Sequence, residues 1–523
     1  MNAQSEIIRD TRTLIPYVLG GFLFMLLLPQ SAGLAAAVII LVGFAGLMLR
    51  WPNVGTLAVL FAIYSNIGVL AMRSQNAIQA SAGSAAQNPR IAVVLVGLAL
   101  LLAVPLVYQI VVRREKVEFD RGFALMLAYL AVLLASSFFA RDQQIIHFEI
   151  GDYLLEGLGL YFLVTNVIRD LTSLRRAIWA LLLAGSLMSG LTVFQKISHT
   201  ESSIYGGMAQ VNTGKEPTVR QILREGTNKI TTEGLTRGGV RAAGPIGEPN
   251  RYAQVLVVLL PLAVLQFRTA RSPKWRALAL ITAALILGGI CLTFSRGALL
   301  TGAIVFAMMA ATGLLNAKHI LTSAMAITLF VVFIDPEVAW RLASLERLKV
   351  LISQTHSASE TLDSSAIRRY EENAAAWHVF LDHPILGVGP GHFAAFYSNP
   401  YSNRIGLIQQ TKGYRGHNLY LETLAETGLI GLLSLLAIII VVMRGLWREH
   451  ERLAQRCPEL DYMAIGFFLS LAAYAISAVF AHLSYQRYFW LLLAVSSAAV
   501  RIIHQASQER PWRDLALRPN ETA

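Results

Sequence analysis

The sequence predicts an all-α, polytopic helical membrane protein with about twelve to fourteen transmembrane helices. Of its 523 residues, 55% are hydrophobic and only 15% are charged, and the mean hydropathy is +0.53. Such a balance is typical of a membrane protein and unlike that of a soluble globule. Apolar runs of about 17 to 20 residues recur along the chain, which is the length that a bilayer-spanning helix requires. Lipid favours helices for these runs because a helix satisfies its own backbone hydrogen bonds.

The apolar runs are separated by short polar connections and by two long ones, 196–250 and 335–427. The spans are predicted near 14–30, 32–49, 54–72, 91–112, 122–140, 152–168, 177–195, 251–267, 277–294, 298–315, 320–334, 428–443, 462–481 and 488–504. The chain thus divides into an N-terminal bundle (1–195), a first large loop (196–250), central helices (251–334), a second large loop (335–427), C-terminal helices (428–504) and a tail (505–523).

Basic residues predict the orientation, because short cytoplasmic loops are enriched in Lys and Arg. They concentrate in the connections 113–116, 169–176, 268–276 and 444–456 and in the tail. An N-in, C-in topology follows, with both large loops outside the cytoplasm. The net charge of +12 is then a topological signal, and it does not indicate nucleic-acid binding. The two cysteines, Cys291 and Cys457, are too far apart on this topology to pair.

Both outer loops contain segments with a predictable structure. The first loop ends in Arg241-Ala-Ala-Gly-Pro-Ile-Gly-Glu248-Pro249-Asn250-Arg251, whose glycines and prolines predict a compact turn into the next span. In the second loop we expect a helix over 365–381, followed by a glycine-rich turn at 387–393. This turn differs from a nucleotide-binding loop because no strand precedes it and Pro390 lacks an amide proton.

Two side chains stand out at the predicted membrane boundary. Arg296 lies between two apolar runs with almost no polar connection, so it is either functional or extends to the outer headgroups. His417 lies where the second loop enters the span near 428–443. An imidazole there can exchange protons with a water-soluble group, although histidine also occurs at membrane interfaces without a chemical role.

Several motifs in order resemble the O-antigen ligase and O-antigen polymerase superfamily. They are Ser295-Arg296-Gly297, Arg369 fifteen residues before Pro384, the run Pro384-Ile-Leu-Gly-Val-Gly-Pro-Gly-His-Phe393, and His417-Asn418-Leu-Tyr-Leu-Glu422. The resemblance covers about 295–443, and Glu248-Pro249-Asn250 is similar to an upstream turn of the family. Each motif is weak alone, and the ordered set is specific.

The resemblance implies an integral-membrane glycosyltransferase on the periplasmic face of a bacterial inner membrane. Its donor is a glycan on a polyprenyl (undecaprenyl) pyrophosphate carrier. Its acceptor is lipid A-core in a ligase of lipopolysaccharide biosynthesis, or another glycan in a polymerase of O-antigen or exopolysaccharide. The family's catalytic residues correspond to His417, Arg296 and Arg369, and the substrate-binding candidates are Arg368, Arg241, Asn250, Asn418 and Arg415. Nothing in these motifs separates ligase from polymerase.

The chemistry of these side chains agrees with such a reaction. Departure of a pyrophosphate builds negative charge, which arginines stabilise through paired N–H groups, and His417 is placed to accept the acceptor's proton. The motifs contain no acidic cluster, so we expect a reaction without metal or cofactor. Glu248 and Glu422 are alternative bases, although turn and helix-capping roles fit them better. A small-solute or anion transporter is the alternative function, which predicts polar residues near mid-bilayer in paired halves.

Overall fold

A computed structural model describes residues 52–67, 102–112, 114–200, 203, 205–212, 241–315, 364–396, 416–454, 456–481 and 486–509. The predicted spans at 14–30, 32–49 and 320–334 lie outside these residues. Within them the chain is almost entirely helical. Six segments are long and apolar enough to cross a membrane: Leu171–Ile197 (α9), Pro249–Thr269 (α11 and α12), Pro273–Leu292 (α13), Leu419–Leu453 (α20), Pro458–Ser477 (α21) and Arg487–Gln508 (in α22, Gln486–Glu509). The predicted class, a polytopic helical membrane protein, is confirmed.

Shorter helices complete the bundle. Pro52–Ser65 (α3), Arg121–Ser137 (α6) and Arg296–Ala311 (α14) overlap the spans predicted at 54–72, 122–140 and 298–315. The span predicted at 152–168 is part of a longer composite helix, formed by Gln143–Asp152 (α7), the π-helix Tyr153–Gly159 (η2) and Leu160–Val167 (α8). On both the long and the short helices, apolar side chains such as Leu127 of α6, Leu280 of α13 and Leu433 of α20 are exposed. Such exposure is expected for a surface in contact with lipid.

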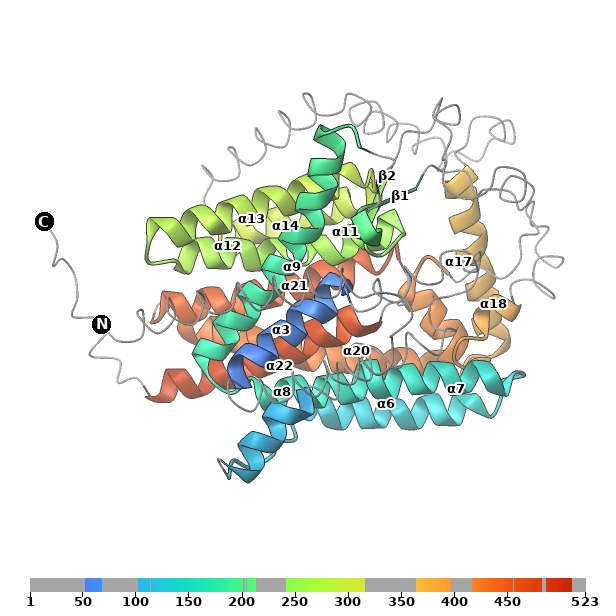
Figure 1. The fold of residues 1–523 in the computed structure, drawn as a ribbon. Coiled ribbons are helices and arrows are strands. Elements are labelled where there is room, and N and C mark those ends of the chain that lie inside the picture. The colour runs from blue at the N-terminus through green and yellow to red at the C-terminus, as the bar shows by residue number, and fades with distance from the viewer. Residues whose placement is uncertain are drawn as a thin grey trace, which may run out of the picture.

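The extramembrane elements gather at one end of the bundle, on the right in Figure 1. They include Ser364–Asp382 (α17), Phe393–Phe396 (α18) and a two-stranded antiparallel sheet of Gln210–Asn212 (β1) and Arg241–Gly244 (β2). The small sheet is an addition to the predicted all-α class. The connection between α12 and α13 lies at the opposite end.

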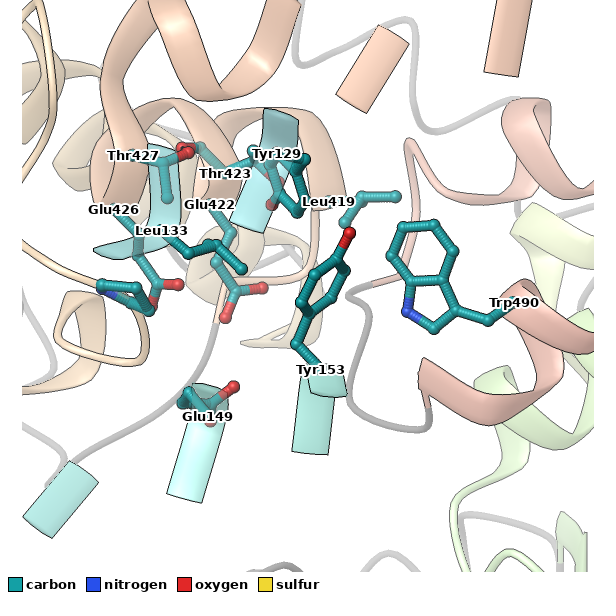
Figure 2. A pocket seen from close by; sticks show the side chains of 11 residues that line it. Tyr129, Leu133, Glu149, Tyr153, Leu419, Glu422, Thr423, Glu426, Thr427 and Trp490 are labelled. Carbon is teal, nitrogen blue, oxygen red and sulfur yellow. Dashed lines mark hydrogen bonds between the residues drawn. The ribbon is translucent and has the colours of Figure 1, made fainter. Parts of the chain in front are cut away.

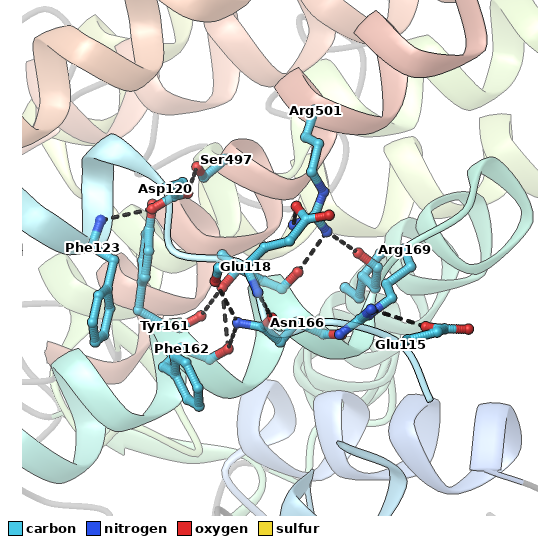
Figure 3. Close-up of polar contacts among 12 residues, drawn as sticks. Glu115, Glu118, Asp120, Phe123, Tyr161, Phe162, Asn166, Arg169, Ser497 and Arg501 are labelled. Carbon is cyan, nitrogen blue, oxygen red and sulfur yellow. Dashed lines mark hydrogen bonds and ion pairs between the residues drawn. The ribbon is translucent and has the colours of Figure 1, made fainter. Parts of the chain in front are cut away.

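Polar contacts at that opposite end join connections that the basic residues predicted to share one side (Figure 3). Glu115 pairs with Arg169 at 3.0 Å, and Arg501 of α22 donates to the carbonyls of Thr165 and Ile168 at 2.7 and 3.0 Å. These contacts link 113–116, 169–176 and the end of α22. The grouping agrees with the predicted topology, whereas the N-in orientation itself stays a prediction.

Helix α20 begins nine residues before the span predicted at 428–443 and contains a kink at Gly428, where φ is 65° and ψ is −167°. The kink opens the helical hydrogen-bond ladder. The segment after α17 fills the gap: Val388 and Gly389 donate amide protons to the carbonyls of Ala425 and Glu426 at 3.1 and 2.9 Å. In return, the Pro384 carbonyl accepts from the amide of Leu429 at 2.9 Å. A broken helix is tolerated when another segment satisfies its backbone in this way.

The glycine-rich turn docks against that kink, as the prediction of a tight turn requires. Gly387 and Gly389 have positive φ angles of 67° and 103°, and a Cβ atom on Gly387 would lie 2.3 Å from the carbonyl carbon of Glu426. His392 is buried, with Nδ1 2.9 Å from the Pro390 carbonyl and Nε2 accepting from the Asp142 amide at 3.0 Å. The turn therefore has a structural role.

Replacing Gly428 with alanine is expected to destabilise the protein. The added Cβ would lie 2.2 Å from the Ile385 carbonyl oxygen, in a backbone conformation that costs L-residues about 1–3 kcal/mol. The measurement is the thermal unfolding midpoint in detergent. Gly190→Ala in α9 is the matched control, since its Cβ would meet no atom closer than 3.9 Å. Equal midpoints for the two variants would contradict this account of the kink.

Candidate functional site

Arg296 lies at the first turn of α14, after a sharp connection from α13. Phe294 adopts a positive φ of 51° in this connection, which is uncommon for a residue other than glycine. Ser295 caps α14 by accepting from the Ala298 amide. Arg296 is therefore the first residue of a helix whose N-terminal amides favour anions, and its side chain is half-buried.

Arg241 of β2 lies at the same connection. Its Nε donates to the Thr293 carbonyl at 2.9 Å, and its Nη2 donates to Oδ1 of Asn250 at 3.1 Å. Asn250 in turn donates from Nδ2 to Glu248 at 2.9 Å. Both ends of the Asn250 amide are thus engaged in holding the turn.

Glu248 caps α11, as predicted, by accepting from the backbone amides of Asn250 and Arg251 at 3.0 and 2.7 Å. Its carboxylate also lies 3.9 Å from Nε of Arg251. Arg241 therefore links two connections, the one before Arg296 and the turn that Glu248 caps before Arg251, and all three arginine side chains are half-buried. We call Arg241, Arg251 and Arg296 the arginine turn. It has the charge and the N–H donors to bind a phosphate group.

His417 forms the second half of the site with Glu372 of α17. Nδ1 of His417 lies 2.5 Å from Oε2 of Glu372, whose side chain is 0% exposed. An ionised carboxylate can only accept, so the hydrogen between the two groups is assigned to Nδ1 of His417, and in this tautomer the lone pair of the imidazole lies on Nε2. A buried carboxylate that holds an imidazole in one tautomer is the arrangement found in catalytic triads.

Arg369 lies one helical turn before Glu372 on α17, and residues three apart share a helix face. A small apolar core fixes this helix against α20: Ala375, Ala376, Val379, Val388, Phe393, Phe396 and Ala425. Arg369 is therefore placed on the side of α17 that carries the contact with His417, and its side chain is half-buried.

The end of α21 connects the two halves of the site. The Leu419 amide, two residues after His417, donates to the carbonyls of Ala478 and Ala481 at 3.0 and 3.1 Å. Phe480, between them, packs against Gly297, where a Cβ atom would lie 2.9 Å from the Phe480 side chain. His417 and Arg296 thus both lie beside residues 478–481, although 120 residues separate them in the sequence.

The remaining predicted residues have other positions. Asn418 caps α20 by accepting from the amides of Tyr420 and Leu421 at 3.0 and 3.2 Å. Arg368 lies in α17, but its side chain, like the whole of Arg415, is outside the described residues. Glu422 lies in the first turn of α20, after the N-cap Asn418; it is 7% exposed and lines a pocket beside the helix.

Sequence reasoning missed two residues of the site. Glu372 is not among the residues predicted for the site, yet its side chain is buried against His417. Its i+3 spacing from Arg369 was the available signal. Arg251 follows Asn250 directly and lies in the first turn of α11. A side chain at this position can reach the turn that precedes the helix. Among the residues that the structure describes, no group of three or more His, Cys, Asp or Glu side chains has the arrangement of a metal site.

Comparison with known proteins identifies one part of the chain. No curated protein matches it. A family model, described as O-antigen ligase, matches residues 278–436. The matched region runs from α13 into α20, so it contains Arg296, Arg369, Glu372 and His417. The protein is therefore a multi-pass helical membrane protein in which residues 278–436 match the model of the O-antigen ligase family.

Proposed function

We propose that this protein transfers a glycan from a polyprenyl pyrophosphate carrier to a lipid A-core or glycan acceptor, on the periplasmic face of a bacterial inner membrane. The observation that supports the proposal is that Leu419, close to His417 in the chain, and Gly297, next to Arg296, both contact residues 478–481, while Glu372 is buried against His417. One half of the site suits a pyrophosphate, and the other suits a hydroxyl that must lose a proton.

In this mechanism the acceptor oxygen attacks the anomeric carbon of the donor glycan. The bond from that carbon to the pyrophosphate oxygen breaks, and the carrier leaves as polyprenyl pyrophosphate. Arg296 and Arg369 stabilise the charge on the leaving group, with Arg241 holding the connection before Arg296. The hydroxyl proton passes to Nε2 of His417, and Glu372 stabilises the resulting imidazolium.

Reconstitution tests the proposal. Purified protein in liposomes is supplied with a polyprenyl-pyrophosphate-linked glycan, with and without lipid A-core, and products are separated by gel electrophoresis. A product that requires lipid A-core identifies a ligase, whereas ladders from donor alone identify a polymerase. Absence of product from folded protein with several donors would contradict glycan transfer and favour the transporter.

Replacing Glu372 with glutamine is expected to lower kcat about 10- to 100-fold, since the neutral amide stabilises the imidazolium less well and permits the wrong tautomer. The double variant E372Q/H417A should be no slower than H417A, because residues that act as a unit are not additive. Glu451→Gln, on the exposed far end of α20, is the matched control. Additive losses would mean that Glu372 does not act through His417.

A further inference from the structure

The mechanism above does not use Arg487, a charged side chain that is buried where α3, α22 and η2 meet. Arg487 is the second residue of α22, and its side chain is 5% exposed. Nη1 of Arg487 pairs with Oε1 of Glu156 in η2 at 3.1 Å, and Nη2 donates to Oδ1 of Asn66, directly after α3, at 2.7 Å. A buried guanidinium is costly unless its N–H groups are paired. These two bonds connect three elements that are distant in the sequence.

Asn66 extends this contact to the turn after β2. The amide nitrogen Nδ2 of Asn66 donates to the Pro245 carbonyl at 2.9 Å. A guanidinium only donates and a carbonyl only accepts, so this orientation of the amide is the one that satisfies both neighbours. Asn66 is 2% exposed and has a φ of 60°, which Asn adopts more readily than most residues. Both the backbone conformation and the two bonds of the amide therefore favour Asn at this position.

Pro245 connects Asn66 to the arginine turn. It follows β2 directly, and β2 begins with Arg241. The backbone between them is tightly packed, because a Cβ atom on Gly244 would lie 2.6 Å from the ring of Tyr252. The Nε of Arg241 then donates to the Thr293 carbonyl, in the connection between α13 and α14, at 2.9 Å. A displacement of Pro245 is therefore expected to displace Arg241 and this connection.

Aromatic contacts hold the elements around Arg487 independently of its hydrogen bonds. Tyr64 of α3 packs edge-to-face on Tyr488 of α22, with ring centroids 5.2 Å apart, and its hydroxyl donates to the Val255 carbonyl of α11 at 2.7 Å. Tyr153, which begins η2, packs on Trp490 of α22 with ring centroids 5.4 Å apart, as the two labelled rings in Figure 2 show. Loss of a single polar bond should therefore leave these helices packed together.

We propose that Arg487 is a positioning residue for the pyrophosphate leaving group, and that it acts through Asn66 and Pro245 on the arginine turn. The inference rests on the proposed function, which assigns the leaving group to that turn. Arg487 is buried and bonded to Glu156 and Asn66, so it acts within the protein and does not contact the substrate. Glu156 fixes the guanidinium, and Asn66 fixes the turn to it.

The variant Asn66→Asp tests the proposal by removing one bond. Its carboxylate still accepts from Arg487, but it cannot donate to the Pro245 carbonyl. Full-length protein in nanodiscs is titrated with farnesyl pyrophosphate, a soluble short polyprenyl pyrophosphate, with empty nanodiscs as the blank. We expect the dissociation constant to rise about tenfold, as for one weakened hydrogen bond to a charged group.

Asn166→Asp is the matched control, because it makes the same substitution at a buried asparagine at the opposite end of the bundle (Figure 3). Nδ2 of Asn166 also donates to backbone carbonyls, those of Glu118 and Phe162, at 3.1 and 3.0 Å. Both variants should lower the thermal midpoint, and only Asn66→Asp should weaken binding of the probe. The double variant R487M/E156Q, which removes both charges of the buried pair, should weaken binding as Asn66→Asp does. Equal dissociation constants for Asn66→Asp and Asn166→Asp, or an unchanged one for the double variant, would overturn the proposal.

Transfer kinetics separate positioning of the donor from a general loss of structure. In the reconstituted system, Asn66→Asp should raise the donor KM about tenfold and leave the acceptor KM unchanged. A fall in kcat with both KM values unchanged would mean a smaller folded fraction and would overturn the positioning role. If the wild type transfers nothing while farnesyl pyrophosphate binds and responds to Asn66→Asp, the proposed function fails and the positioning of the pyrophosphate site stands. Normal transfer by the wild type with a donor KM that Asn66→Asp does not change has the opposite meaning.

Discussion

Replacing His417 with alanine is expected to lower the turnover of glycan transfer about 10²- to 10⁴-fold, the usual contribution of a positioned general base. Binding of the carrier-linked donor should be retained, because the arginine turn lies on a different segment and keeps its own contacts. The measurement is kcat in the reconstituted assay together with the affinity for a non-reactive polyprenyl pyrophosphate analogue. The shape of the site should survive, since the Leu419 amide and the Asn418 cap hold this segment independently of the imidazole.

His147→Ala is the matched control, because His147 is an exposed histidine on α7 and takes no part in the proposed reaction. His392→Ala has a different expected effect: it removes a buried ring that links Pro390 to Asp142, so it should lower the thermal midpoint. A His417→Ala protein that loses donor affinity at unchanged kcat would make His417 a carrier contact and exclude it as the base.

The sequence was sufficient to predict features that depend on local pattern. Apolar run length located each described span, although α20 begins nine residues before the span predicted at 428–443, and the helix expected at 365–381 is α17, Ser364–Asp382. The glycine-rich segment was correctly read as a turn, because positive φ angles and a missing amide are properties of single residues. Arg296 was correctly placed at the boundary of two helices, because the lengths of the two flanking apolar runs determine where the short connection between them falls.

Features that depend on tertiary contacts could not be predicted. Gly428 was taken as the start of a span, yet α20 passes through it because residues 384–389, distant in the sequence, satisfy the open backbone. Glu372 and His417 are 45 residues apart, and Arg241 reaches Thr293 across 52 residues. The hydrophobic periodicity of a sequence does not predict contacts between residues so far apart in the chain. The buried carboxylate of Glu372 is the clearest example, because a charge next to Arg369 on an amphipathic helix resembles an exposed ion pair until its partner is known.

Replacing Arg296 with alanine is expected to reduce kcat/KM for transfer by more than about 100-fold while the protein still inserts and accumulates. Each charge-assisted hydrogen bond to a phosphate oxygen contributes about 1.5–3 kcal/mol, and a guanidinium can form two. Folding should be little affected, because Ser295 and Thr293 fix the connection through their own hydrogen bonds. Arg276→Ala, an exposed arginine in the first turn of α13, is the matched control.

Arg296→Lys distinguishes charge from geometry at this position. A lysine keeps the positive charge at the N-terminus of α14 but lacks the planar fork that binds two phosphate oxygens at once. If the guanidinium binds the pyrophosphate in that way, the lysine variant should fall between wild type and alanine, with its loss in kcat rather than in donor affinity, since the second hydrogen bond strengthens as charge builds on the leaving group. Full activity of Arg296→Lys would leave only a general electrostatic role. Full activity of Arg296→Ala would assign phosphate binding to the other arginines, Arg241, Arg251 and Arg369, which remain at the site.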